Sequence, residues 1–242
     1  MVIKMVRLII FDFDGTLVDS FTLRPMAWKE VAKGVSKYLK EHGIRVNIND
    51  ITEEIGKLER EMNYLGILDR KEWWRRLLKK YGIPVKEDLL LKWARLYWNV
   101  VANGQELYSD VTESLKELKK MGYSLALLTD TDGLEGMKSI RIEKSGLKEF
   151  FDDILIAGED VAQTKPSDEP FRVLLDKMGV SPSNSVHIGD SLHTDVPGAK
   201  KVGIITIIVI RDMKILGNVN ETNMPDMFIK DLYTIIRLLK KL

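Results

Sequence analysis

The sequence contains no cysteine, which excludes disulfide bonds, metal sites with thiolate ligands and a cysteine nucleophile. It also lacks an excess of charge of either sign, because 37 Lys and Arg residues balance 36 Asp and Glu residues. A dedicated nucleic-acid binder usually carries a basic face. We therefore expect no nucleic-acid partner.

Long apolar runs are missing as well. No stretch approaches the roughly 20 residues that cross a bilayer, and the first residues lead into an apolar segment without room for a signal peptide. We therefore expect a soluble, cytoplasmic protein with no membrane partner. At 242 residues, the chain is long enough for a core domain that carries an insertion.

Short apolar runs alternate with longer stretches of helical periodicity, which is typical of an α/β fold. This pattern predicts a doubly wound, Rossmann-like parallel sheet. The expected strands cover residues 6–12, 124–129, 153–157, 185–189 and 204–210, and the helices between and after them cover residues 110–121, 134–145, 169–178, 195–202 and 232–242.

Residues 21–108 show only helical patterns and contain all five tryptophans. Helices are expected at residues 25–41, 50–62, 69–81 and 86–102. We interpret residues 21–108 as an all-helical cap domain inserted into an α/β catalytic core of residues 1–20 and 109–242. Tryptophans at helical spacing, such as Trp93 and Trp98, usually form the core of a small helical bundle.

Polar residues gather where the expected strands end. These clusters are Asp12 and Asp14 with Gly15 and Thr16, then Thr129 and Asp130, then Lys165 and Pro166, and finally Asp190 and Ser191 with Asp195. The carboxyl ends of parallel strands meet at one edge of a sheet, where ligands bind in open α/β folds. We therefore expect the four clusters to lie together.

Several carboxylates at one point are costly unless a cation neutralises them. Oxygen ligands without His or Cys suit a hard ion such as Mg²⁺. Lys165 would then supply positive charge, and Thr129 a hydroxyl, for the oxygens of a bound phosphoryl group. The pattern indicates a carboxylate nucleophile, a neighbouring acid and base, a phosphate clamp and a metal.

The segments 12–20 (DFDGTLVDS) and 189–199 (GDSLHTDVPGA), with Lys165-Pro166 between them, resemble motifs of the haloacid dehalogenase superfamily. The resemblance is to its phosphatase branch with a helical cap, the type of phosphoglycolate phosphatase and beta-phosphoglucomutase, and it covers the whole chain. It implies a Mg²⁺-dependent phosphatase that acts on a small phosphorylated metabolite.

By this resemblance, Asp12 attacks phosphorus and becomes a transient aspartyl-phosphate. Asp14 protonates the leaving oxygen and then deprotonates the attacking water. The resemblance also implies that Mg²⁺ is held by the carboxylates of Asp12 and Asp190 and by the backbone carbonyl of Asp14.

Thr129, Asp130 and Lys165 are the expected phosphate-binding residues. The resemblance further implies that Asp195 supports the site by holding Lys165 or the waters of the metal. Gly15 and Ser191 are also expected to support the site. A helix N-cap is the alternative role for Asp195.

Two positions depart from the family pattern. Asp130 stands where the family usually has Asn, and its carboxylate would repel a phosphate dianion, so we expect it to act through its backbone N–H or on a polar group of the substrate. Ser109 and Asp110 replace an expected Pro-Gly pair, which we interpret as a neutral change in a helix-capping loop.

Three other functions remain open. A phosphosugar mutase shares all four motifs and differs mainly in the cap. A 2-haloacid dehalogenase uses the same nucleophile on carbon, but it needs no second aspartate and lacks one at the position of Asp14. A phospho-receiver domain also takes phosphate on aspartate, but it is about half this length and has no cap. The sequence leaves the substrate and the oligomeric state open.

Overall fold

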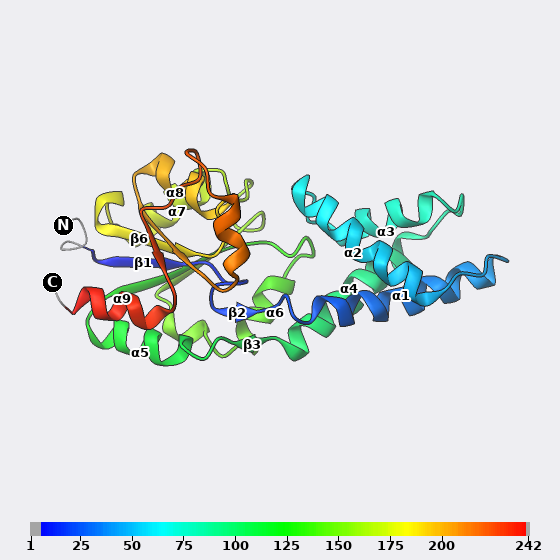
Figure 1. Ribbon diagram of the computed structural model, residues 1–242, viewed down its shortest axis with the longest axis horizontal. Helices are drawn as coiled ribbons and strands as arrows, with labels where there is room; N and C mark the ends of the chain where they lie inside the picture. Colours follow the sequence, from blue (N-terminus) through cyan, green and yellow to red (C-terminus); the bar gives the residue numbers. More distant parts are fainter. Residues whose placement is uncertain (1–5, 241–242) are drawn as a thin grey trace. The chain divides into compact units, whose positions relative to one another are not determined.

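The computed structural model describes residues 6–240 (Figure 1). Residues 1–5, on which the expected absence of a signal peptide partly rests, and residues 241–242 of the expected last helix lie outside this part. The chain divides into two compact units. The core unit contains the described residues up to Asp19, Glu106–Asp130 and the chain from Ser145 onward, and the helical unit contains Ser20–Gln105 and Thr131–Lys144.

A six-stranded sheet forms the centre of the core unit, and all of its neighbouring strands pair in parallel. The strand order is β5-β4-β1-β6-β7-β8. The strands are β1 (Leu8–Phe11), β4 (Ser124–Asp130), β5 (Asp153–Ala157), β6 (Ser185–Gly189), β7 (Ile205–Val209) and β8 (Met227–Ile229). The predicted α/β fold with a parallel sheet is confirmed, and β8 is a short edge strand that was not expected.

Helices cover both faces of this sheet. Figure 1 shows α7 (Glu169–Met178) and α8 (Asp195–Val202) on one side and α5 (Val111–Lys120) and α9 (Leu232–Leu239) on the other. Alternate residues of β1 and β4, including Leu8 and Ile10, pack in one apolar cluster with α7, as the period of a strand requires. The arrangement is doubly wound.

The central position of β1 determines where its polar end lies. Phe11, the last residue of β1, pairs with Leu127 of β4 and with Ile188 of β6. The chain that follows Phe11 therefore emerges between the ends of two neighbouring strands. This is the edge at which open parallel sheets bind ligands.

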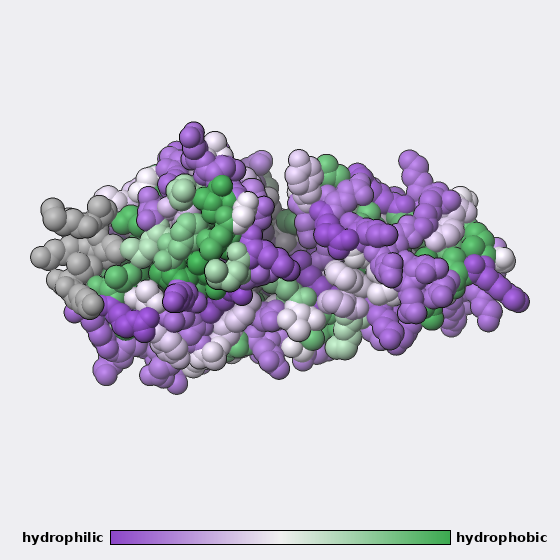
Figure 2. Space-filling view, in the orientation of Figure 1, coloured by the Kyte–Doolittle hydropathy of each residue, from purple (hydrophilic) through white to green (hydrophobic). Residues whose placement is uncertain are grey.

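The helical unit is built from α1 (Arg24–Glu41), α2 (Ile48–Tyr64), α3 (Arg70–Lys79), α4 (Glu87–Gly104) and α6 (Met137–Lys144). Trp73, Trp74, Trp93 and Trp98 are all buried in its apolar cluster. The interpretation of the tryptophans at helical spacing as bundle core is confirmed. On the face drawn in Figure 2, this unit shows mainly polar side chains, whereas apolar side chains gather on the core unit over the segment after β7.

Residues 131–144 differ from the expected division, which assigned them to the core. They belong to the helical unit because their polar side chains are bound there. The fully buried Arg141 donates from Nη1 to Asp132 Oδ1 at 2.8 Å and from Nε to Gln105 Oε1 at 3.0 Å. Trp98 Nε1 also donates to the carbonyl of Asp132, at 3.0 Å.

A second unexpected feature is a two-stranded antiparallel ribbon of β2 (Val18–Asp19) and β3 (Glu106–Leu107). It joins the core segments that precede and follow residues 20–105. No helix within residues 6–240 has both the length and the apolar character needed to cross a bilayer.

Candidate active site

Asp12 directly follows β1, and its position is held by the sheet. Its N–H donates to the carbonyl of Ile188 at 2.9 Å, which keeps it in register with β6. The chain then turns sharply, because Gly15 has a φ of 77° and its N–H donates to the carbonyl of Val18 at 2.8 Å. A side chain at this position would be strained. The chain therefore turns immediately after Asp14.

The side chain of Lys165 connects its own polar cluster to two of the others. Its buried Nζ donates to Asp12 Oδ1 and to Asp195 Oδ1, each at 2.6 Å. Burial lowers the pKa of Lys165, but the carboxylates of Asp12 and Asp195 outweigh it and raise that pKa well above its usual value. The ammonium group therefore keeps its charge and lies against the expected nucleophile.

Asp195 is the first residue of α8, and its carboxylate points back into the site. Oδ1 is bound by Lys165 and lies 3.0 Å from His187 Nε2, and Oδ2 accepts the N–H of Ser191 at 2.9 Å. Burial would raise the pKa of Asp195, but Lys165 and His187 hold it below its usual value. Thr194 occupies the N-cap position of α8, so the alternative N-cap role of Asp195 is not what this structure contains.

His187 and Ser191 complete the surroundings of Asp195. His187 is buried, which lowers its pKa. An ionised carboxylate only accepts, so we assign the proton of this ring to Nε2. Ser191 contributes its amide, while its Oγ accepts the N–H of Thr194 at 3.2 Å. Nothing in the sequence indicated the contact of His187 with Asp195.

Three carboxylates form an acidic cluster at this edge of the sheet. Oxygens of Asp12, Asp190 and Asp195 lie within 4.8 Å of one another. Burial and the neighbouring carboxylates raise the pKa of Asp12 to about 7 and that of Asp190 well above its usual value, despite the opposing charge of Lys165. The protein alone therefore does not neutralise all of the negative charge that this cluster can carry.

This donor set fits a hard divalent cation. It consists of carboxylate oxygens, the ligands that Mg²⁺ prefers. The raised pKa values of Asp12 and Asp190 follow first from burial and then from like charges, and a bound cation would offset both. Asp195 is the least suited of the three as a direct ligand, because Lys165, His187 and Ser191 already occupy its oxygens. Asp12 and Asp190 are therefore the carboxylates best placed to bind an ion.

Thr129 and Asp130 end β4, the strand beside β1. Thr129 is buried. Asp130 Oδ1 accepts the backbone N–H of Lys165 at 2.9 Å. The sequence suggested that Asp130 acts through its backbone N–H or on a polar group of the substrate. In the structure its carboxylate binds the loop that carries Lys165.

Asp110 differs from its sequence interpretation. It begins α5 without a side-chain capping bond. Its Oδ2 instead accepts from Arg211 Nη1 at 2.9 Å and from the N–H of Leu232 at 2.7 Å. The change from the expected Pro-Gly pair is therefore not neutral, because it introduces a buried carboxylate with partners far away in the chain.

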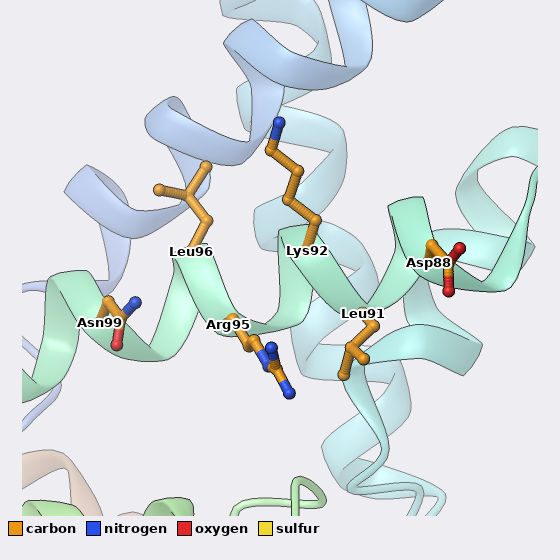
Figure 3. Close-up of a pocket in the computed structure, with 6 residues that line it drawn as sticks. All are labelled: Asp88, Leu91, Lys92, Arg95, Leu96 and Asn99. Carbon is orange, nitrogen blue, oxygen red and sulfur yellow. The ribbon is translucent and has the colours of Figure 1, made fainter.

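A separate pocket lies on the helical unit (Figure 3). All of its lining residues come from one helix, α4, and none belongs to the clusters described above. They are Asp88, Leu91, Lys92, Arg95, Leu96 and Asn99. The pocket is thus a surface hollow along one face of α4, and it is not part of the candidate active site.

Proteins of known function and structure resemble this chain. The glyceraldehyde 3-phosphate phosphatase of Methanopyrus kandleri is 24% identical over 246 residues, covering 98% of this chain and 100% of that protein. A HAD phosphatase structure from Thermococcus onnurineus superposes with a TM-score of 0.68 at 26% identity, covering 97% of this chain and 98% of that one. The 2-haloacid dehalogenase of Pseudomonas syringae shares the fold, with a TM-score of 0.68 at 21% identity and coverage of 98% and 99%.

The family match includes every polar cluster of the site. Residues 6–203 match the haloacid dehalogenase-like hydrolases. This span contains the strand ends that carry Asp12, Asp130 and Asp190, the loop of Lys165, and α8 with Asp195. We conclude that the protein belongs to the haloacid dehalogenase-like hydrolase family.

Proposed function

We propose that this protein is a Mg²⁺-dependent phosphatase that hydrolyses a small phosphorylated metabolite through an aspartyl-phosphate on Asp12. The observation that carries the proposal is the pair of Asp12 and Lys165, 2.6 Å apart and buried at the carboxyl edge of the sheet. A carboxylate held by a permanent cation is oriented before substrate arrives, which lowers the cost of reaching the transition state.

In the first step, Lys165 holds one oxygen of Asp12 and the other oxygen attacks phosphorus. The bond between phosphorus and the ester oxygen breaks, and Asp14 donates a proton to the departing oxygen. The products are an alcohol and an acyl phosphate on Asp12.

In the second step, Asp14 accepts a proton from water as the water oxygen attacks phosphorus. The bond between phosphorus and Asp12 breaks, which releases inorganic phosphate and restores the carboxylate. Lys165 and the hydroxyl of Thr129 would bind phosphoryl oxygens in both steps. Asp130 would position Lys165 by accepting its backbone N–H, and Asp195 would position it by accepting from its Nζ.

Mg²⁺ would be held by the carboxylates of Asp12 and Asp190, with the backbone carbonyl of Asp14 as a further oxygen ligand. When bound, it would neutralise charge on the phosphoryl group and on the two aspartates. The raised pKa values of Asp12 and Asp190 support this assignment, because burial and the neighbouring carboxylates disfavour the ionised forms and a bound cation would favour them.

The similarity to a glyceraldehyde 3-phosphate phosphatase over nearly the whole chain supports a small phosphorylated metabolite as substrate. A triose phosphate is therefore the first ester to assay. Phosphoglycolate, sugar phosphates and nucleoside monophosphates complete a useful panel, scored by kcat/KM with MgCl₂ present.

The decisive experiment is trapping of the intermediate. Rapid acid quenching with a ³²P-labelled substrate should give a labelled protein that hydroxylamine discharges, as an acyl phosphate requires. Asp12→Asn should give no label and at least about 10³-fold slower turnover, because an amide is a poor nucleophile. Unlabelled wild-type protein during steady turnover would contradict the proposed intermediate.

The same assays separate the other functions. Exchange of phosphate between positions of a sugar without release of inorganic phosphate would indicate a mutase. Release of halide from a 2-haloacid, with every ester unchanged, would indicate a dehalogenase. A stable phospho-protein formed from acetyl phosphate, without turnover, would indicate a receiver.

A further inference from the structure

Arg211 binds the loop that follows the two motif aspartates. Its Nη2 and Nε donate to the carbonyl of Thr16, at 2.8 and 3.3 Å, and its Nη1 donates to Asp110 Oδ2 at 2.9 Å. Arg211 follows β7 and lies beyond residues 6–203, which match the family. One guanidinium group thus joins the Thr16 loop to the start of α5.

The buried carboxylate of Asp110 holds the guanidinium of Arg211 in place. It is 3% exposed, and the same oxygen that accepts from Arg211 also accepts the N–H of Leu232 at the start of α9. A buried carboxylate needs a charged or strongly donating partner. The Arg211 side chain, 13% exposed, is that partner, and its planar fork can serve Asp110 and Thr16 together.

Tyr108 holds the same loop one residue further along. Its N–H donates to the carbonyl of Leu17 at 3.1 Å, and its ring lies under Arg211, whose Cζ is 4.1 Å from the ring centroid. Such stacking favours a fixed guanidinium plane. Tyr108 and Arg211 therefore bind two consecutive carbonyls of the loop.

These anchors complement the bonds within the loop itself. The N–H groups of Leu17 and Val18 both donate to the carbonyl of Phe13, and Gly15 donates to Val18. Those bonds close the turn but do not attach it to the rest of the core. The contacts of Arg211 and Tyr108 attach it at Thr16 and Leu17, next to the pairing of Val18 with Leu107.

We propose that Arg211, oriented by Asp110 and Tyr108, is a positioning residue for Asp14 in the phosphatase reaction. The inference rests on the proposed function for its catalytic meaning. Asp14 is two residues before Thr16 in the chain. Asp12 is four residues before it and is also held by β6 and Lys165, so loss of the anchor affects Asp14 more. Asp14 takes part in both proposed steps, but only the first, the proton transfer to the leaving oxygen, depends on the leaving group.

The test uses leaving groups that differ in their need for a proton. Arg211→Lys keeps a cation beside Asp110 but replaces the fork that spans Asp110 and Thr16. We expect kcat/KM, which reports only the first step, to fall about 10-fold for glyceraldehyde 3-phosphate, an alkyl ester, since general acids typically contribute 10²- to 10⁴-fold. For 4-nitrophenyl phosphate, whose leaving group departs without a proton, kcat/KM should fall less than about 3-fold.

Arg237→Lys is the matched control, because Arg237 is an arginine of α9 whose side chain is 64% exposed, and it should leave both rates unchanged. A general loss of folded protein would lower both rates of Arg211→Lys by one factor. An equal fractional loss on the two esters would therefore overturn the proposal.

Amide hydrogen exchange provides a readout that does not depend on turnover. Exchange at residues 14–18 should be faster in Arg211→Lys than in the wild type and in Arg237→Lys. Unchanged exchange would overturn the anchoring by Arg211. If the wild type hydrolyses neither ester while exchange increases as expected, the proposed function fails and the anchor remains.

Discussion

Asp195 occupies the space that a side chain at Gly189 would need. A Cβ at Gly189 would lie 2.2 Å from Asp195 Oδ2, much closer than atoms approach in proteins. Gly189→Ala should therefore displace the carboxylate that binds Lys165, at a cost of about 1–3 kcal/mol in the free energy of unfolding. We expect kcat to fall at least about 10-fold, because Lys165 loses its second partner.

Chemical denaturation and steady-state kinetics measure both effects of Gly189→Ala. Gly217→Ala is the control, since a Cβ there would meet nothing within 4 Å and Gly217 has no positive φ. Normal activity of Gly189→Ala would show that the site tolerates a displaced Asp195, contrary to the importance we give its bond with Lys165.

Asp130 can be tested with a pair of substitutions that differ in one property. Asp130→Asn removes the charge but keeps an oxygen that accepts the N–H of Lys165, whereas Asp130→Ala removes the acceptor. We expect kcat of Asp130→Asn within about 3-fold of the wild type and kcat of Asp130→Ala at least about 10-fold lower, as loss of a bond to a charged group implies. Equal damage in both variants, mainly in KM, would instead indicate direct substrate contact.

The raised pKa of Asp12 predicts a pH-dependent response to metal. Without a cation, Asp12 keeps its proton in the folded protein up to about pH 7, whereas its usual pKa is 3.8. Its contribution to stability is therefore complete below about pH 3.8 and is lost as the pH rises through 7. Mg²⁺ binds the ionised carboxylate, so its stabilising effect should be larger at high pH.

Thermal unfolding with and without MgCl₂ checks this prediction. The increase in Tm should be greater at pH 8 than at pH 5.5, a direction that follows from competition between the proton and the metal for one carboxylate. Asp190→Asn, which removes the other proposed carboxylate ligand, should largely abolish the increase. An equal increase at both pH values, or one that persists in Asp190→Asn, would place the ion elsewhere.

Tyr97 provides a stability test within the helical unit. Its buried hydroxyl donates to Glu59 Oε2 at 2.9 Å, and burial raises the pKa of Tyr97 to about 12. Tyr97→Phe should lower the free energy of unfolding by about 1–2 kcal/mol, because Glu59 loses one donor. Tyr64→Phe, at a side chain that is 91% exposed, should change it by less than about 0.5 kcal/mol.

The sheet was largely predictable because its strands are buried on both faces and read as continuous apolar runs. The expected strands at residues 153–157 and 185–189 agree with β5 and β6 to the residue. β2, β3 and β8 have only two or three residues. Such segments carry too few residues for a periodic pattern, and only tertiary pairing defines them.

The motif residues could be recognised in the sequence from their types and spacing. The residues to which they are hydrogen bonded could not. Asp130 bonds to the Lys165 amide 35 positions away, and Asp110 bonds to Arg211 101 positions away. A carboxylate in a loop has no local signature that distinguishes a cap from a long-range ion pair. The roles proposed for Asp12, Asp14 and Asp190 stay predictions until the kinetic experiments are done.

Because residues 131–144 belong to the helical unit, they must be exchanged together with residues 20–105 when this unit is moved between relatives. An exchange of helical units between relatives, cut only at residues 20 and 105, would separate Arg141 from Gln105 and Trp98 from Asp132. A chimera should therefore carry both segments from the same parent. It needs four junctions rather than two, and one of them falls directly after Asp130.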